Sequence, residues 1–168
     1  MRQLWAAALV ATAAAFELAS FTYSAGEGLL TLTFDEAVQS RTLNASGIVL
    51  QSNATAERAP MQRFRLRGAH PTLGQFLYTT PYNTTETLTL VMRDDDLLEV
   101  QALSDLAVDA KSVWLVAEEG LARAVSDNDR SAAITKPLEV DTYVPDTLQS
   151  EMELYTIDMH EGLICFKF

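Results

Sequence analysis

The two-residue period of the apolar positions is the feature that most constrains the fold of this chain. In LLTLTF (29–34) and ETLTLVM (86–92), apolar and polar residues alternate, as in a strand with one face in a core and the other in water. Turn signals such as Ala-Gly-Glu-Gly separate such runs at the spacing of roughly 8–12 residues that is typical of two packed sheets. The pattern predicts an all-β sandwich, with further strands at 16–24, 47–52, 61–68, 74–80, 112–118 and 138–144.

One segment departs from this period. Residues 93–108 begin with Arg-Asp-Asp-Asp and place Leu97, Leu98, Val100 and Leu103 near helical spacing, which predicts a short helix linking two strands across the end of the sandwich. Asp at the N-cap and in the first turn accepts free backbone N–H groups and suits the helix dipole. The alternative interpretation of the three aspartates is a calcium-binding cluster.

The core must stabilise the fold without a disulfide inside the chain. Cys165 is the only cysteine among 168 residues. Its place in an apolar run favours a buried thiol, and a partner elsewhere is the alternative. Because 48% of the residues are hydrophobic, a sizeable core is expected. The residues predicted to be buried between the sheets are Leu30, Leu32, Phe34, Leu88, Leu90, Trp114 and Val116.

Residues 1–15 have the pattern of a secretory signal peptide. Arg2 supplies a positive start, an apolar stretch follows, and Ala13 and Ala15 form a small-x-small cleavage pattern. The apolar stretch is shorter than the ~20 residues of a spanning helix, which argues against a membrane anchor. We therefore expect a secreted, extracellular protein with no membrane span.

Three N-glycosylation sequons agree with secretion. They begin at Asn44, Asn53 and Asn83, and none has proline in its middle position. All three lie in polar sequence expected to form loops or strand edges. The sequence therefore predicts an N-linked glycan on at least one of them.

The end of the chain repeats its beginning. At an offset of 162 − 28 = 134 residues, LASFTYSAGEGLLTLTF (18–34) aligns without a gap with MELYTIDMHEGLICFKF (152–168). Because a lone hairpin is only marginally stable in water, we expect a longer chain of repeats. The predicted organisation is a signal peptide at 1–15, a sandwich at 16–142, a linker at 143–151 and the first hairpin of a second repeat at 152–168.

Several segments resemble a known class of repeat domain. LLTLTFDEAV (29–38), followed by Thr-Leu and another strand, is similar to bacterial-Ig-like and cadherin-like units. DDDLLEVQALSDLAV (94–108), VDTYVPD (140–146) and LYTIDMHEGLICFKF (154–168) resemble a variant found in tandem in very large surface glycoproteins of algae and other stramenopiles. Those proteins include mastigoneme (flagellar hair) components and adhesin-like chains. The resemblance covers essentially the whole mature chain and implies an Ig-like β-sandwich.

The chain departs from that class at two turns. SDNDRSA (126–132) stands where the class carries an Asp-x-x-Gly-Asn turn, which leaves the geometry of that turn open. Ser24 stands where the second copy has Asp158, so any role of that aspartate is absent from the first unit.

Calcium is the one ligand that the sequence suggests. Hard cations bind carboxylates gathered from loops, and cadherin-like units stiffen their junctions in this way. A merely acidic surface is the alternative, which the lack of a D-x-D-x-D-G loop favours. The candidate ligands, all in expected turns or the linker, are Glu36, Asp127, Asp129, Asp141 and Asp146.

Signals for catalysis or nucleic-acid binding are missing. His70 and His160 lie in separate expected turns without metal-ligand spacing, and there is no G-x-S-x-G elbow or glycine-rich phosphate loop. The net charge of −11 argues against a nucleic-acid surface. We therefore expect neither an enzyme nor a nucleic-acid-binding protein.

The combined prediction is a structural extracellular glycoprotein unit of a tandem-repeat protein. It would form, or attach to, a filament or cell-surface coat, with further repeats and neighbouring chains as its partners. The alternative is an adhesin-type module that binds carbohydrate or a partner cell surface. An exposed aromatic platform would favour the sugar-binding alternative, whereas Trp114 is expected in the core.

Overall fold

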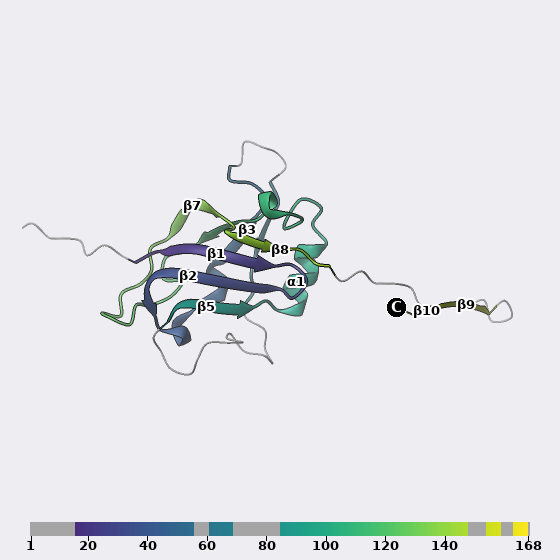
Figure 1. The fold of residues 1–168 in the computed structure, drawn as a ribbon, viewed down its shortest axis with the longest axis horizontal. Helices are drawn as coiled ribbons and strands as arrows, with labels where there is room; N and C mark the ends of the chain where they lie inside the picture. The colour runs from purple at the N-terminus through teal and green to yellow at the C-terminus, as the bar shows by residue number, and fades with distance from the viewer. Residues whose placement is uncertain (1–15, 56–60, 69–84, 148–153, 159–162, 168) are drawn as a thin grey trace, which may run out of the picture.

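The computed structural model of this chain describes residues 16–55, 61–68, 85–147, 154–158 and 163–167. These residues are mostly β-structure, with two four-stranded sheets, a separate two-stranded sheet and one α-helix (Figure 1). The prediction of a mostly β fold with one helix is confirmed. The expected signal peptide at 1–15 and the expected strand at 74–80 lie outside the described residues.

The first sheet consists of β1 (Leu18–Ser24), β2 (Leu29–Val38), β5 (Thr85–Val91) and β8 (Thr142–Val144). Its strand order is β5-β2-β1-β8. β1 and β2 form an antiparallel hairpin, and Gly28 in its turn has φ 63°, in the left-handed region that favours glycine. A Cβ on Gly28 would also lie only 3.1 Å from Leu97. Both constraints explain why the turn ends in glycine.

The second sheet consists of β3 (Ile48–Gln51), β4 (Arg63–Arg65), β6 (Trp114–Ala117) and β7 (Ile134–Glu139). Its order is β4-β3-β6-β7, and every neighbouring pair is antiparallel. Pro137 lies in β7, an edge strand, where a missing backbone N–H costs no ladder hydrogen bond on the open side.

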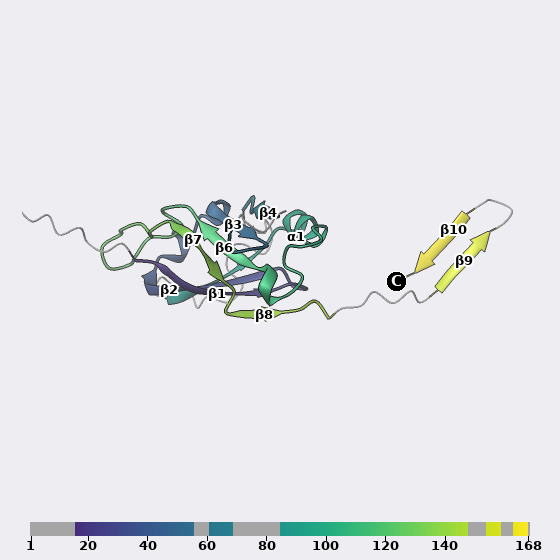
Figure 2. The ribbon, with the colours of Figure 1, turned by 90° about the horizontal axis from the view of Figure 1, so that it is seen from above.

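The two sheets form two layers around a shared core (Figure 2). β1, β2 and β5 bury Phe21, Leu32 and Leu88, and the second sheet buries Leu50 and Leu115 against them. Five residues of the predicted core are confirmed as buried, namely Leu30, Leu32, Phe34, Leu88 and Leu90.

The predicted burial of Trp114 and Val116 is wrong. Both side chains are only half-buried, whereas Val113, Leu115 and Ala117 face the core. Because neighbouring residues of a strand point to opposite faces, Trp114 and Val116 lie on the outer face of the second sheet. The strand was expected at the right place with its two faces exchanged.

The chain changes sheets at Val140 and Asp141. LEVDTYV (138–144) was expected as one strand, but β7 ends at Glu139 in the second sheet and β8 begins at Thr142 in the first. β8 pairs parallel with β1, from Thr22↔Thr142 to Ser24↔Val144. This crossing joins the two layers and leads the chain out at the end of the body opposite to its entrance (Figure 1).

The helix α1 (Asp94–Gln101) is shorter than the predicted segment 93–108. Its N-cap residue is Arg93, which makes no side-chain cap, so the expected Asp N-cap is wrong; Asp94, Asp95 and Asp96 occupy the first turn. Beyond Ala102 the chain forms turns and then a 3-10 helix capped by Asp109. The 3-10 helices are η1 (Ser40–Thr42), η2 (Ala45–Gly47) and η3 (Ala110–Ser112).

The third sheet is the hairpin of β9 (Leu154–Asp158) and β10 (Leu163–Lys167), which pair antiparallel with each other and with no other described strand (Figure 2). This hairpin has five residue pairs, from Leu163↔Asp158 to Lys167↔Leu154. Subtracting 134 from each residue number gives the pairs of the first hairpin from Leu29↔Ser24 to Thr33↔Ser20. The two hairpins therefore share one register as well as one sequence pattern.

Candidate functional site

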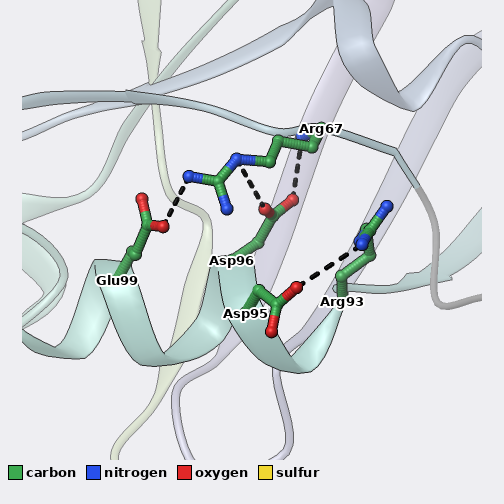
Figure 3. Close-up of polar contacts among 5 residues, drawn as sticks. All are labelled: Arg67, Arg93, Asp95, Asp96 and Glu99. Carbon is green, nitrogen blue, oxygen red and sulfur yellow. Dashed lines mark hydrogen bonds and ion pairs between the residues drawn. The ribbon is translucent and has the colours of Figure 1, made fainter.

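A cluster of charged side chains surrounds the start of α1 (Figure 3). Asp96 is fully buried, and its Oδ2 accepts a 2.8 Å hydrogen bond from the backbone N–H of Arg67. The Nε of Arg67 lies 3.8 Å from Asp96 Oδ1, and its guanidinium also hydrogen-bonds to Glu99. The cluster thus connects the helix to the segment that follows β4, and no sequence pattern had indicated this contact.

The charges in this cluster favour a structural role. Asp95 pairs with Arg93 at 3.4 Å, and the hydrogen bond to Glu99 raises the pKa of the Arg67 guanidinium. Asp96 Oδ1 has no hydrogen-bond partner among the described residues, but the neighbouring guanidinium repels any second cation. The three aspartates therefore serve the helix start and its anchoring better than they would serve calcium.

The five calcium candidates lie at different places in the body. Near the end of β2, Glu36 Oε2 accepts a 3.2 Å hydrogen bond from Ser126 Oγ, and Asp127 Oδ1 accepts a 3.0 Å bond from the N–H of Asp129. Asp141 and Asp146 flank β8, where Asp141 accepts a 3.2 Å bond from Thr142. Across the described ranges, no three His, Cys, Asp or Glu side chains gather closely enough to hold a metal ion.

Two of the three sequons can be placed. Asn44, the N-cap residue of η2, and Ser46, within η2, are both exposed, and the Ser46 hydroxyl donates a 2.7 Å hydrogen bond to Asn44 Oδ1. Asn53 is half-buried just beyond β3, and Thr55 is exposed. Asn83 lies outside the described residues, as do His70 and His160, and nothing is described of the Cys165 side chain.

A cavity of about 460 Å³ lies on the outer face of the second sheet, around Trp114. Trp114 pairs across the sheet with Gln51 on one side and Glu139 on the other. Its indole N–H donates a 3.0 Å hydrogen bond to the carbonyl of Lys111. The cavity is lined by Asn53, Ala54, Thr55, Lys111, Trp114 and Glu139. Sequence reasoning missed it because Trp114 was assigned to the core.

A second cavity, of about 380 Å³, lies where the chain leaves β8. Tyr143 lines it and donates a 2.8 Å hydrogen bond from its hydroxyl to the carbonyl of Ala107. Tyr23 also lines it, and its buried hydroxyl has no hydrogen-bond partner among the described residues. Burial, with a smaller contribution from Tyr143, raises the pKa of Tyr23 to about 12. The wall also includes Pro145 and Asp146, so part of the segment predicted as a linker (143–151) lines this cavity.

Comparisons with known proteins give no relative. No family model, no curated protein and no solved structure matches the chain. Within the described ranges, no helix combines the length and the apolar character of a membrane span.

Proposed function

We propose that this chain is a structural unit of an extracellular, N-glycosylated tandem-repeat protein that forms, or attaches to, a filament or cell-surface coat. Its partners are further repeats of the same chain and neighbouring chains in the assembly. The resemblance of its segments to mastigoneme-like surface glycoproteins suggests this role. No step of the proposal requires an enzymatic activity.

The shared register of the two hairpins carries the proposal. Two unrelated hairpins can share a Gly-containing turn by chance, but the β9–β10 hairpin also repeats the five residue pairs of β1–β2 at one constant offset. In the first unit this hairpin pairs on its two sides with β5 and β8. A second copy therefore suits a second unit of the same architecture.

The finer fold assignment is part of the same proposal. Two four-stranded sheets around one core, with a chain that crosses from one to the other at Val140 and Asp141, agree with an Ig-like β-sandwich. The parallel β1–β8 pair and the helix α1 would then be additions to a mainly antiparallel plan.

The location and mass of the native chain test this function. Antibodies raised against residues 16–147 should label the surface or the filaments of intact cells in electron microscopy. The labelled chain should be much heavier than the 18.5 kDa of the 168 residues of this sequence. Label confined to the cell interior, or a native chain of about that mass, would refute the structural-repeat proposal.

A carbohydrate-binding module is the second candidate function. An accessible aromatic side chain would favour it, and Trp114, which was expected in the core, supplies one. It is half-buried on an outer sheet face and shares a cavity with Lys111, Thr55 and Glu139. Retention of the secreted protein on immobilised oligosaccharides, and its loss in Trp114→Ala, would support this function.

A further inference from the structure

The cavity around Trp114 has the size and the chemistry of a site for one sugar ring. Its volume of about 460 Å³ lies within the range of roughly 300–1,000 Å³ found for small-ligand pockets. Trp114 contributes a large apolar ring whose only polar group already donates to Lys111. The ring therefore offers an apolar face, on which the C–H groups of a pyranose can stack.

The charged groups at the rim point to a neutral ligand with many hydroxyl groups. Lys111 supplies hydrogen-bond donors, and Glu139 supplies acceptors. Because Lys111 and Glu139 carry opposite charges, together they give neither an anionic nor a cationic ligand a net advantage. Sugar hydroxyls both donate and accept, so they can bond to both side chains.

The position of Asn53 indicates where such a ring comes from. Asn53 lines the cavity itself, together with Thr55, the third residue of its sequon. A glycan linked to Asn53 Nδ2 begins at that wall, so its first ring has Trp114 within the same cavity. Asn44 lies instead in an exposed turn beside η2.

We propose that this cavity holds a pyranose ring stacked on Trp114, and that the ring is the first N-acetylglucosamine of a glycan on Asn53. The proposal rests on the glycosylation that the proposed function includes. The stacked sugar covers the apolar surface of Trp114 and joins the end of β3 to β6 and β7.

The test uses Trp114 fluorescence in the full chain, secreted by a glycosylating host under a supplied leader. Trp5→Phe makes Trp114 the sole tryptophan. Thr55→Ser keeps the Asn53 sequon and Thr55→Ala removes it, while Ser46→Ala removes only the Asn44 sequon. Intact mass and glycopeptide analysis give the occupancy of each site. Trimming the glycan enzymatically to one N-acetylglucosamine isolates the effect of the first ring.

The expected result is lower acrylamide quenching and a shift of emission to shorter wavelength in Thr55→Ser compared with Thr55→Ala. Both differences should survive trimming to one sugar, and Ser46→Ala should leave them unchanged. Equal quenching in the two Thr55 variants, with Asn53 occupied, would overturn the proposal.

An unmodified Asn53 would overturn the glycan as the source of the ring. Oligomers of N-acetylglucosamine added to Thr55→Ala then decide on the site. If these oligomers protect Trp114 from acrylamide in a saturable way, the cavity is still a sugar site, but its ligand comes from another molecule. If they give no protection, the sugar site itself is overturned. Because the leader is supplied, these results are independent of where the native chain resides, which is what tests the proposed function.

Discussion

A pair of matched substitutions, one just before β6 and one within it, tests which face of this segment lies in the core. Val113 is fully buried and Val116 is half-buried on the outer face, only three residues further along the chain. Val→Thr keeps the shape and the β-branched form of the side chain but replaces one methyl group by a hydroxyl group. The same chemical change therefore probes both faces of one segment.

The two substitutions should lower the free energy of unfolding by different amounts, because only Val113 is buried away from water. In Val113→Thr the new hydroxyl is buried in an apolar environment, which should lower the free energy of unfolding by about 1–3 kcal/mol. In Val116→Thr the hydroxyl can reach water, so the change should stay within about 0.5 kcal/mol. At roughly 2–4 °C per kcal/mol for a chain of this size, Val113→Thr should lower Tm by about 2–12 °C.

Urea unfolding followed by far-UV circular dichroism measures both free energies, and calorimetry gives Tm. If Val116→Thr destabilised the chain as much as Val113→Thr, the outer-face assignment of Trp114 and Val116 would be refuted. The sugar site built on Trp114 would then lose its basis as well.

Three further predictions concern other parts of the chain. Burial raises the pKa of Tyr23 from 10.0 to about 12, so the folded state favours the neutral phenol. The resulting contribution to the free energy of unfolding, about 2–3 kcal/mol, is complete below pH 10 and is lost as the pH rises through 12. Urea unfolding at pH 9 and pH 11.5 should show that loss in the wild type, and a Tyr23→Phe variant with the same pH dependence would contradict it. Asp96→Ala leaves the N–H of Arg67 without its acceptor and should lower the free energy of unfolding by about 1–3 kcal/mol in the same assay. Asp95→Ala, at an exposed ion pair, should lower it by less than about 1 kcal/mol. Equal decreases in the two variants would refute the anchoring role of Asp96. Amide hydrogens of the β9–β10 hairpin should exchange faster than those of β1 and β2 in the isolated chain, since a hairpin paired only with itself is marginally stable. Equal protection of the two hairpins would show that β9 and β10 belong to the first unit.

Strict alternation allowed the faces of β2 and β5 to be predicted from the sequence. Thr31 and Thr33 in β2, and Thr87 and Thr89 in β5, alternate with leucines, so only one assignment of the faces places the leucines inside. SVWLVAE (112–118) offers no such choice, because Val113, Leu115 and Ala117 form one apolar face and Trp114 and Val116 form another. A continuous apolar run shows that a strand exists but does not show which face is inside.

The change of sheet at Val140 could not be predicted for a different reason. Leu138 and Val140 alternate with Glu139 and Asp141, but the next residue packed against the core is Tyr143, three positions after Val140. Such a break in the two-residue period fits a bend or a β-bulge within one strand equally well, so it does not identify a change of sheet. Val140 is buried and Tyr143 is packed against the core, although they belong to different sides of the crossing. A two-residue period shows which side chains face the core, but it does not show to which sheet a strand belongs.

The anchoring of α1 depends on partners far apart in the chain. Three consecutive aspartates indicate the start of a helix, but only Asp96 is buried. Its partner Arg67 is 29 residues away and follows a strand of only three residues. Local sequence patterns do not encode such a contact.

The parallel pairing of β1 with β8 determines how the unit would respond to a pulling force. Besides the register from Thr22 to Ser24, the N–H of Asp141 donates to the carbonyl of Phe21, and the N–H of Ala25 donates to the carbonyl of Val144. The chain enters at the start of β1 and leaves at the end of β8, so tension along the chain pulls these neighbouring strands in opposite directions (Figure 1). Their hydrogen bonds are then loaded together in shear, whereas strands pulled apart at one end would lose them one at a time. A string of such units would transmit tension along its length while each unit stayed folded.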